Sequence, residues 1–202
     1  MLEIIDQFIP ILWAGFLVNL EIGVAAVVIA IMLAVPLTLV RRRLPLLQRP
    51  IRLCIQLMQA LPTYVTMFFV LNLLPDHLAL WGQPIEGVTA VVLAQSVYLT
   101  AYVAEDAHKA LEHLRRKQLE QALLFLPNLL RGFVVVVMSS GFGAAVGVSE
   151  AVSVTIHQAE RLPALGDRVL LFGVTITFFV LVFGSVNVVI QRLINRLGRA
   201  PA

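Results

Sequence analysis

Charged residues are scarce in this chain, and their scarcity excludes most soluble folds. Only 13% of the 202 residues are charged, whereas 59% are hydrophobic, and the mean hydropathy is +0.91. A soluble domain of this composition could not cover its surface with side chains that bind water. The sequence therefore predicts an integral membrane protein.

Cysteine and catalytic motifs are also nearly missing. The single cysteine, Cys54, has no intrachain partner for a disulfide, so packing is its expected role. The sequence contains no HExxH motif, no GxSxG motif and no phosphate-binding loop, and its four histidines are scattered. We expect no enzyme activity, no metal site and no cofactor in this chain. Any work driven by ATP and Mg²⁺ must draw on another protein.

Long apolar segments are what the chain has in place of these motifs. Five segments lack any formal charge, namely 22–40, 53–75, 87–104, 132–149 and 169–191. Each approaches or exceeds the roughly 20 residues that cross a hydrocarbon core. They do not alternate like barrel strands, and a helix satisfies its own backbone hydrogen bonds in lipid. The prediction is an all-α bundle of five transmembrane helices in a single transmembrane domain, residues 1–202.

The basic residues predict how the bundle is oriented. They follow the first, third and fifth spans, as Arg41–Arg43, Arg115–Lys117 and Arg192–Arg199, whereas the N-terminus and the loops 76–86 and 150–168 are acidic or mixed. Lys and Arg near span ends are retained in the cytoplasm. We expect the N-terminus outside and the C-terminus in the cytoplasm. The net charge of +3 follows from this topology and gives no reason to expect nucleic-acid binding.

A proline and an arginine interrupt two of the apolar segments and change the expected bounds of their helices. Pro62 lies inside the second span, so a kink or two stacked half-helices is expected around Ala60–Thr63. Arg131 interrupts the apolar stretch after Leu119, and we expect the fourth span to run from about 130 to 148. Residues 115–128 would then be free to form a short helix in a cytoplasmic loop, 105–128. Gly143 and Gly147 have the GxxxG spacing that permits close helix packing.

Polar residues inside the spans are the default candidates for function, because they are costly in lipid. One interpretation is that they hydrogen-bond between helices and hold the bundle together. The other is that they line a substrate path. The candidates for that path are Glu21, Gln56, Gln59, Gln95, Tyr98, Ser139 and Ser140. Glu21 stands out, because a buried carboxylate needs a partner or a proton.

Three segments resemble a known family. Ala101–Glu105 (AYVAE) resembles the end of the third core helix in permease subunits of polar amino-acid ABC importers of the histidine/glutamine/arginine type. Residues 110–122 (ALEHLRRKQLEQA) are similar to that family's approach to its EAA coupling loop, and Gly147–Glu150 (GVSE) is similar to its GVPE sequence. The resemblance implies a type I ABC importer permease in the inner membrane of a bacterium.

The resemblance also implies partners and a docking element. Such permeases pair with an identical or paralogous permease, receive substrate from an extracytoplasmic binding protein, and dock a coupling helix on a cytoplasmic ABC ATPase. Substrate passes between the two permeases by alternating access. In this chain the implied coupling residues are Leu114, Arg115, Arg116, Lys117, Leu119, Glu120, Ala122 and Leu123.

The chain departs from the family at functional positions, which leaves a second interpretation open. The residues before Pro62 are Gln56, Gln59, Ala60 and Leu61, where the family has a Glu, an Arg and a Gly-Thr pair. The family's late Lys-Asp pair falls on Met138 and Ser139, and the stretch from Leu126 to Gly147 is shorter than the family's. The EAA coupling loop is thus degenerate. The alternative to an importer subunit is a structural or regulatory subunit that pairs with a competent permease.

Overall fold

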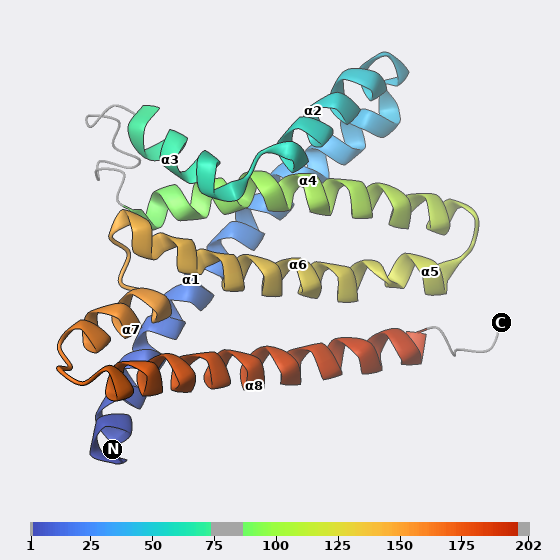
Figure 1. Ribbon diagram of the computed structural model, residues 1–202. Helices are drawn as coiled ribbons and strands as arrows, with labels where there is room; N and C mark the ends of the chain where they lie inside the picture. The colour runs from blue at the N-terminus through green and yellow to red at the C-terminus, as the bar shows by residue number, and fades with distance from the viewer. Residues whose placement is uncertain (1, 74–86, 198–202) are drawn as a thin grey trace.

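The computed structural model describes residues 2–73 and 87–197 of the chain, and most of these residues are helical, as predicted. The loop 76–86, which was predicted to face outside, lies outside the described residues. Figure 1 shows the arrangement of the helices. In chain order the elements are α1 (Leu2–Arg43), η1 (Pro45–Leu47), α2 (Gln48–Ala60), α3 (Thr63–Leu73), α4 (Gly87–Arg115), α5 (Leu119–Leu123), α6 (Phe125–Ser139), η2 (Ser140–Val146), α7 (Ala151–Glu160) and α8 (Leu165–Leu197).

Among the described residues, four stretches are long and apolar enough to cross a membrane. They are Ile4–Arg43, Gly87–Arg115, Leu119–Val146 and Leu165–Leu197. The pair α2 and α3 passes the same test only as one broken span, bent by 94°. The predicted count of five holds if this bent pair is counted as a span. α4, α6 and α8 run roughly parallel in Figure 1, and α1 crosses them and contacts all three.

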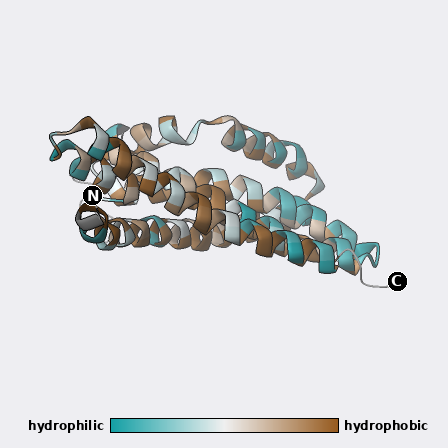
Figure 2. Cartoon of the chain, turned by 60° about the horizontal axis from the view of Figure 1, so that its bottom comes forward, coloured by the Kyte–Doolittle hydropathy of each residue, from teal (hydrophilic) through white to brown (hydrophobic). Residues whose placement is uncertain are grey.

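The polar parts of the long helices gather at one end of the bundle. α1 ends on Arg41–Arg43, α4 ends on Arg115, and the last turn of α8 carries Arg196. These three helix ends lie at the same side of Figure 1, and Figure 2 shows hydrophilic residues concentrated there. We call this the basic end. The three basic regions that predicted the orientation therefore lie together.

Small residues let α1 and α4 approach closely. Ala26, Ala30 and Ala34 recur every four residues on α1 and are fully buried, and they share one core cluster with Ala101 and Ala104 of α4. Small side chains at helical spacing permit close contact between membrane helices. The GxxxG spacing at Gly143 and Gly147 has a different role. Gly147 ends η2 with φ +79°, a left-handed conformation that glycine adopts at little cost.

The second predicted span is broken where proline was expected to break it. α2 ends at Ala60, and Leu61 is extended with ψ 120°, because the residue before a proline is pushed out of the helical region. The two halves are not stacked, since they meet at 94°. α2 packs Ile51, Ile55 and Met58 against the α1–α4 core.

The fourth span begins earlier than predicted. α5, α6 and η2 follow one another so closely that Leu119–Val146 forms one membrane-length stretch. Arg131 lies inside this stretch, exposed on α6, and does not mark its start at about 130. The segment 115–128 therefore contains the end of α4, a turn, α5 and the first residues of α6. The short helix predicted within 115–128 is present as α5, although it continues almost directly into α6.

Candidate functional site

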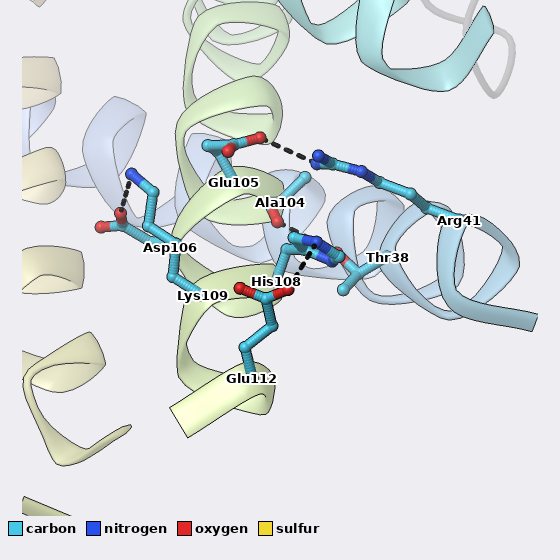
Figure 3. A network of polar contacts seen from close by, with 8 residues as sticks. All are labelled: Thr38, Arg41, Ala104, Glu105, Asp106, His108, Lys109 and Glu112. Carbon is cyan, nitrogen blue, oxygen red and sulfur yellow. Dashed lines mark hydrogen bonds and ion pairs between the residues drawn. The ribbon is translucent and has the colours of Figure 1, made fainter. Parts of the chain in front are cut away.

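At the basic end, α1 is fastened to α4 by two polar contacts. Arg41 Nη1 donates to Glu105 Oε2 at 2.8 Å, and its side chain is only 9% exposed. One turn earlier, Thr38 Oγ1 donates to the carbonyl oxygen of Ala104 at 3.3 Å. Figure 3 shows both contacts side by side. A charge-assisted bond shielded from water is stronger than a neutral one, so these contacts hold the end of α1 on α4.

Two further side-chain contacts in Figure 3 lie within α4 itself. Lys109 Nζ is 3.8 Å from Asp106 Oδ1, and His108 Nε2 is 3.9 Å from Glu112 Oε1. The contact of His108 with Glu112 is an ion pair only when the imidazole is protonated. The Lys109–Asp106 pair, three residues apart on one helix, contributes only about 0.3–0.5 kcal/mol. Both contacts join side chains of the charged part of α4. They do not fasten it to another element.

The chain reverses between α4 and α5 in a tight turn. The backbone N–H of Lys117 donates to Leu114 O at 3.1 Å, and that of Gln118 donates to His113 O at 2.9 Å. Lys117 adopts φ +60°, and the side chains of His113 and Gln118 lie 2.9 Å apart. Only Arg116, Lys117 and Gln118 separate the two helices. The element at the basic end is therefore a helical hairpin.

The predicted coupling residues all lie on this hairpin. Leu114 and Arg115 end α4, Arg116 and Lys117 form the turn, and Leu119, Glu120, Ala122 and Leu123 lie on α5. Three leucines project apolar surface at the tip, because Leu114, Leu119 and Leu123 are 49%, 60% and 43% exposed. Ala122 differs from them, since it is buried. Basic side chains and exposed leucines together form a surface suited to a protein partner.

The predicted substrate-path residues fall into two sets. Gln95 Nε2 donates to Ser139 Oγ at 2.9 Å, so α4 and the end of α6 bring these two together. Tyr98 lies on the same helix as Gln95 and stacks with Tyr102, with ring centroids 6.5 Å apart. Ser140 follows Ser139 in the sequence and is fully buried, but its hydroxyl bonds to Asn19 of α1. The second set consists of Glu21, Gln56 and Gln59, which are exposed on the surface of this chain and form no hydrogen bond with Gln95 or Ser139.

The expectation that Glu21 is a buried carboxylate was wrong. The buried polar residue of this part of α1 is Asn19, two positions earlier. Its Nδ2 donates to Ser140 Oγ at 2.8 Å and to Glu150 Oε2 at 3.1 Å. Its Oδ1 accepts the backbone N–H of Ala151 at 3.1 Å. We call Asn19, Ser140 and Glu150 the Asn19 cluster.

Glu150 is the carboxyl-bearing member of this cluster and caps α7. Its two carboxylate oxygens accept the backbone N–H groups of Val152 and Ser153 at 2.8 and 2.9 Å, which are otherwise unpaired at the start of a helix. Burial raises the pKa of Glu150 above its ordinary value, although the bonds from Val152, Asn19 and Ser153 each lower it. The carboxylate thus depends on these donors for its charged form.

Gly15 permits the close contact between α1 and the start of α7. A Cβ atom at Gly15 would lie 2.8 Å from Ala151 N and 2.9 Å from Ala151 Cα, so α1 and the start of α7 touch backbone to backbone. One turn further along α1, Asn19 can therefore reach the first N–H of α7. Among the described residues, no group of three or more His, Cys, Asp or Glu side chains could hold a metal ion.

Part of the chain matches a known protein family. Residues 26–125 match the family described as "Binding-protein-dependent transport system inner membrane component". The matched range contains the α1–α4 contact, Ala101–Glu105 and the whole hairpin. A search of curated proteins finds no match.

Solved structures share the fold over nearly the whole chain. One is described as "Crystal structure of an amino acid ABC transporter with histidines". It superposes with a TM-score of 0.73 at 17% identity, covering 95% of this chain and 96% of that chain. Another is the MetNI methionine ABC transporter in inward-facing conformations, with a TM-score of 0.68 at 12% identity, covering 93% and 98%. The chain therefore has the fold of these transporter structures, and residues 26–125 match a family of transport-system components.

Proposed function

We propose that this chain is the transmembrane subunit of an ATP-driven ABC importer for a polar or charged amino acid. The observation that carries the proposal is the agreement between the family match over residues 26–125 and the fold shared with an amino acid ABC transporter over 95% of the chain. The chain would lie in a bacterial inner membrane with its N-terminus outside and its basic end in the cytoplasm. Its partners would be an ABC ATPase, a second permease and an extracytoplasmic binding protein.

The ATPase would dock on the hairpin of α4 and α5. ATP and Mg²⁺ would bind to that partner, and closure of the ATPases would move the hairpin. Because Arg41 and Thr38 fasten the end of α1 to α4, movement of the hairpin would carry both helices as one body. Alternating access by rigid bodies around a central path needs such a stiff connection.

The substrate would pass between two permease subunits, along faces that are exposed in the single chain. Glu21 on α1 and Gln56 and Gln59 on α2 are exposed polar residues of this kind. An anionic side chain such as Glu21 suits the ammonium or guanidinium group of an amino acid. Tyr98, Ser139 and Gln95 would contribute from α4 and α6, and Ser140 would support them from the Asn19 cluster.

A specific observation also favours a second candidate, a structural or regulatory subunit that pairs with a competent permease. The turn between α4 and α5 is three residues long, and α5, the helix that follows it in the described residues, has only five residues before α6 begins at Phe125. In addition, Gln95 and Ser139 satisfy each other. A subunit with this hairpin would hold the complex together while its partner carried the substrate.

Reconstitution into proteoliposomes tests both candidates. The chain is co-expressed with its ATPase, second permease and binding protein, and uptake of labelled histidine, arginine and glutamine is measured together with ATP hydrolysis. The coupling variant is Leu119→Asp with Glu120→Arg, because Leu119 is exposed whereas Ala122 is buried and its substitution would disturb folding. Glu160→Arg, an exposed charge reversal on α7, is the matched control.

The outcomes separate the proposals. An importer subunit loses uptake and coupled ATP hydrolysis in the hairpin variant and keeps both in the control. A structural subunit keeps uptake when Glu21, Gln56 and Gln59 are replaced by alanine together, whereas a transporting subunit loses it or changes its substrate preference. If no ATPase co-purifies with the wild-type chain, the permease proposal itself is overturned.

A further inference from the structure

A polar cavity of about 670 Å³ lies at the basic end, between the end of α1, the start of α2 and the charged part of α4. Its cationic lining residues are Arg41, Arg42, Arg49, Arg52, Lys109 and Arg115. Only two carboxylates, Glu105 and Glu112, line it as well. With His108 neutral, six cations against two anions leave a formal charge of +4 around one cavity.

Most of this positive charge has no carboxylate partner. Arg41 is bound to Glu105, and Lys109 lies 3.8 Å from Asp106. Among the described residues, none of the ion pairs within 4.0 Å includes Arg42, Arg49, Arg52 or Arg115. Like charges that share a cavity repel one another, and a bound anion removes that repulsion.

The backbone keeps these arginines together. α2 is anchored on the α1–α4 core through Ile51, Ile55 and Met58, so Arg49 and Arg52 cannot move away with their helix. Arg49, Arg52, Gln56 and Gln59 follow a spacing of three, four and three residues, which forms one polar stripe along α2. Arg42 approaches the same cavity from the last turn of α1.

The geometry points to a binding site for a phosphate-bearing anion in this cavity. The guanidinium group presents paired donors that match the oxygens of a phosphate group. Gln48, the first residue of α2, also lines the cavity and offers an amide donor there. The volume lies within the roughly 300–1,000 Å³ of small-ligand sites. The site does not depend on the proposed transport function.

Two sources offer this chemistry, a soluble phosphate compound and the headgroup of an anionic phospholipid. The neighbouring surface favours the lipid. Leu46, Leu53 and Leu57 are 94%, 57% and 59% exposed on η1 and α2, so apolar surface suited to acyl chains adjoins the basic cavity. Basic pockets between membrane helices bind anionic headgroups in this way.

Native mass spectrometry of the full chain in detergent tests the site. The probes are phosphatidylglycerol, phosphatidylcholine and inorganic phosphate. The site variant is Arg49→Gln with Arg52→Gln, and the matched control is Arg192→Gln with Arg196→Gln, two exposed arginines at the end of α8 that do not line the cavity. Circular dichroism checks that both variants stay helical.

The expected result is that the wild-type chain retains phosphatidylglycerol over phosphatidylcholine. The site variant weakens this binding by about tenfold or more, equivalent to about 1.4 kcal/mol, whereas the control weakens it by less than about twofold. If inorganic phosphate binds with the same dependence on Arg49 and Arg52 and the lipid does not, the ligand is a soluble phosphate compound. Equal losses in both variants, or no preference for either phosphate-bearing anion, overturn the proposal.

Discussion

Replacing Asn19 by leucine is expected to destabilise the chain strongly, although the two side chains have the same number of heavy atoms. Asn19 makes three buried hydrogen bonds, to Ser140, Glu150 and the backbone N–H of Ala151. Leucine leaves the Ala151 N–H and one Glu150 oxygen without this partner. An orphaned buried group costs about 1–3 kcal/mol, and hydrogen bonds between membrane helices contribute about 0.6 kcal/mol on average. We therefore expect a loss of about 2–4 kcal/mol in the free energy of unfolding.

The measurement is unfolding of the full chain in detergent, followed by circular dichroism. Ser185→Ala is the control, because the exposed Ser185 hydroxyl bonds only to Leu181 O of its own helix at 2.7 Å. The control should change stability by less than about 0.5 kcal/mol. A cycle that combines Asn19→Leu with Ser140→Ala should show a coupling of about 1 kcal/mol, because the residues are bonded at 2.8 Å. A loss below about 0.5 kcal/mol for Asn19→Leu would refute the assignment of the cluster as a stabilising contact.

Three further predictions use the same unfolding measurement. Gly15→Ala should cost about 1–3 kcal/mol, because the new Cβ would meet the Ala151 backbone at 2.8–2.9 Å; an unchanged stability would show that α1 and α7 do not touch. Gly147→Ala should lower the free energy of unfolding by about 1 kcal/mol, because alanine is strained at a φ of +79°. Gly173→Ala is the control and should not destabilise α8, since a Cβ atom at either glycine has no neighbour within 4 Å. Equal effects of the two substitutions would contradict the backbone argument. Arg41→Glu should destabilise the chain, and Glu105→Arg in the same chain should restore part of the loss; two additive losses would rule out their ion pair.

The sequence was a good guide to the long helices because charge is costly in lipid. Charged residues collect at helix ends, so charge-free segments such as 87–104 and 169–191 mark the inner parts of α4 and α8. The helices themselves run further, since Arg115 and Arg196 remain helical outside the apolar part. The second span was harder to predict. Its polar stripe, Arg49, Arg52, Gln56 and Gln59, was the available signal that α2 differs from an ordinary span, while the 94° bend depends on tertiary packing.

Which polar residue of α1 is buried could not be predicted from composition alone. Asn19 and Glu21 are two residues apart, so they lie about 200° apart around a helix with 3.6 residues per turn, and only one of them can face the core. Composition favours Glu21, because a carboxylate in a span is more unusual than an amide. The pattern of small residues favours Asn19, since Gly15, Asn19, Ala26, Ala30 and Ala34 lie on one stripe of α1 that packs against its neighbours. The face of a helix therefore decides which polar residue is buried.

Polar or close backbone contacts join α1 to other helices at two places that lie far apart along its length. Near the basic end, Thr38 and Arg41 join α1 to α4. Toward the other end, Gly15 and Asn19 join it to the start of α7. The alanine stripe between them keeps α1 close to α4. We therefore expect a displacement of the α4–α5 hairpin to reach α7 through α1, and α8 through its packing on α7.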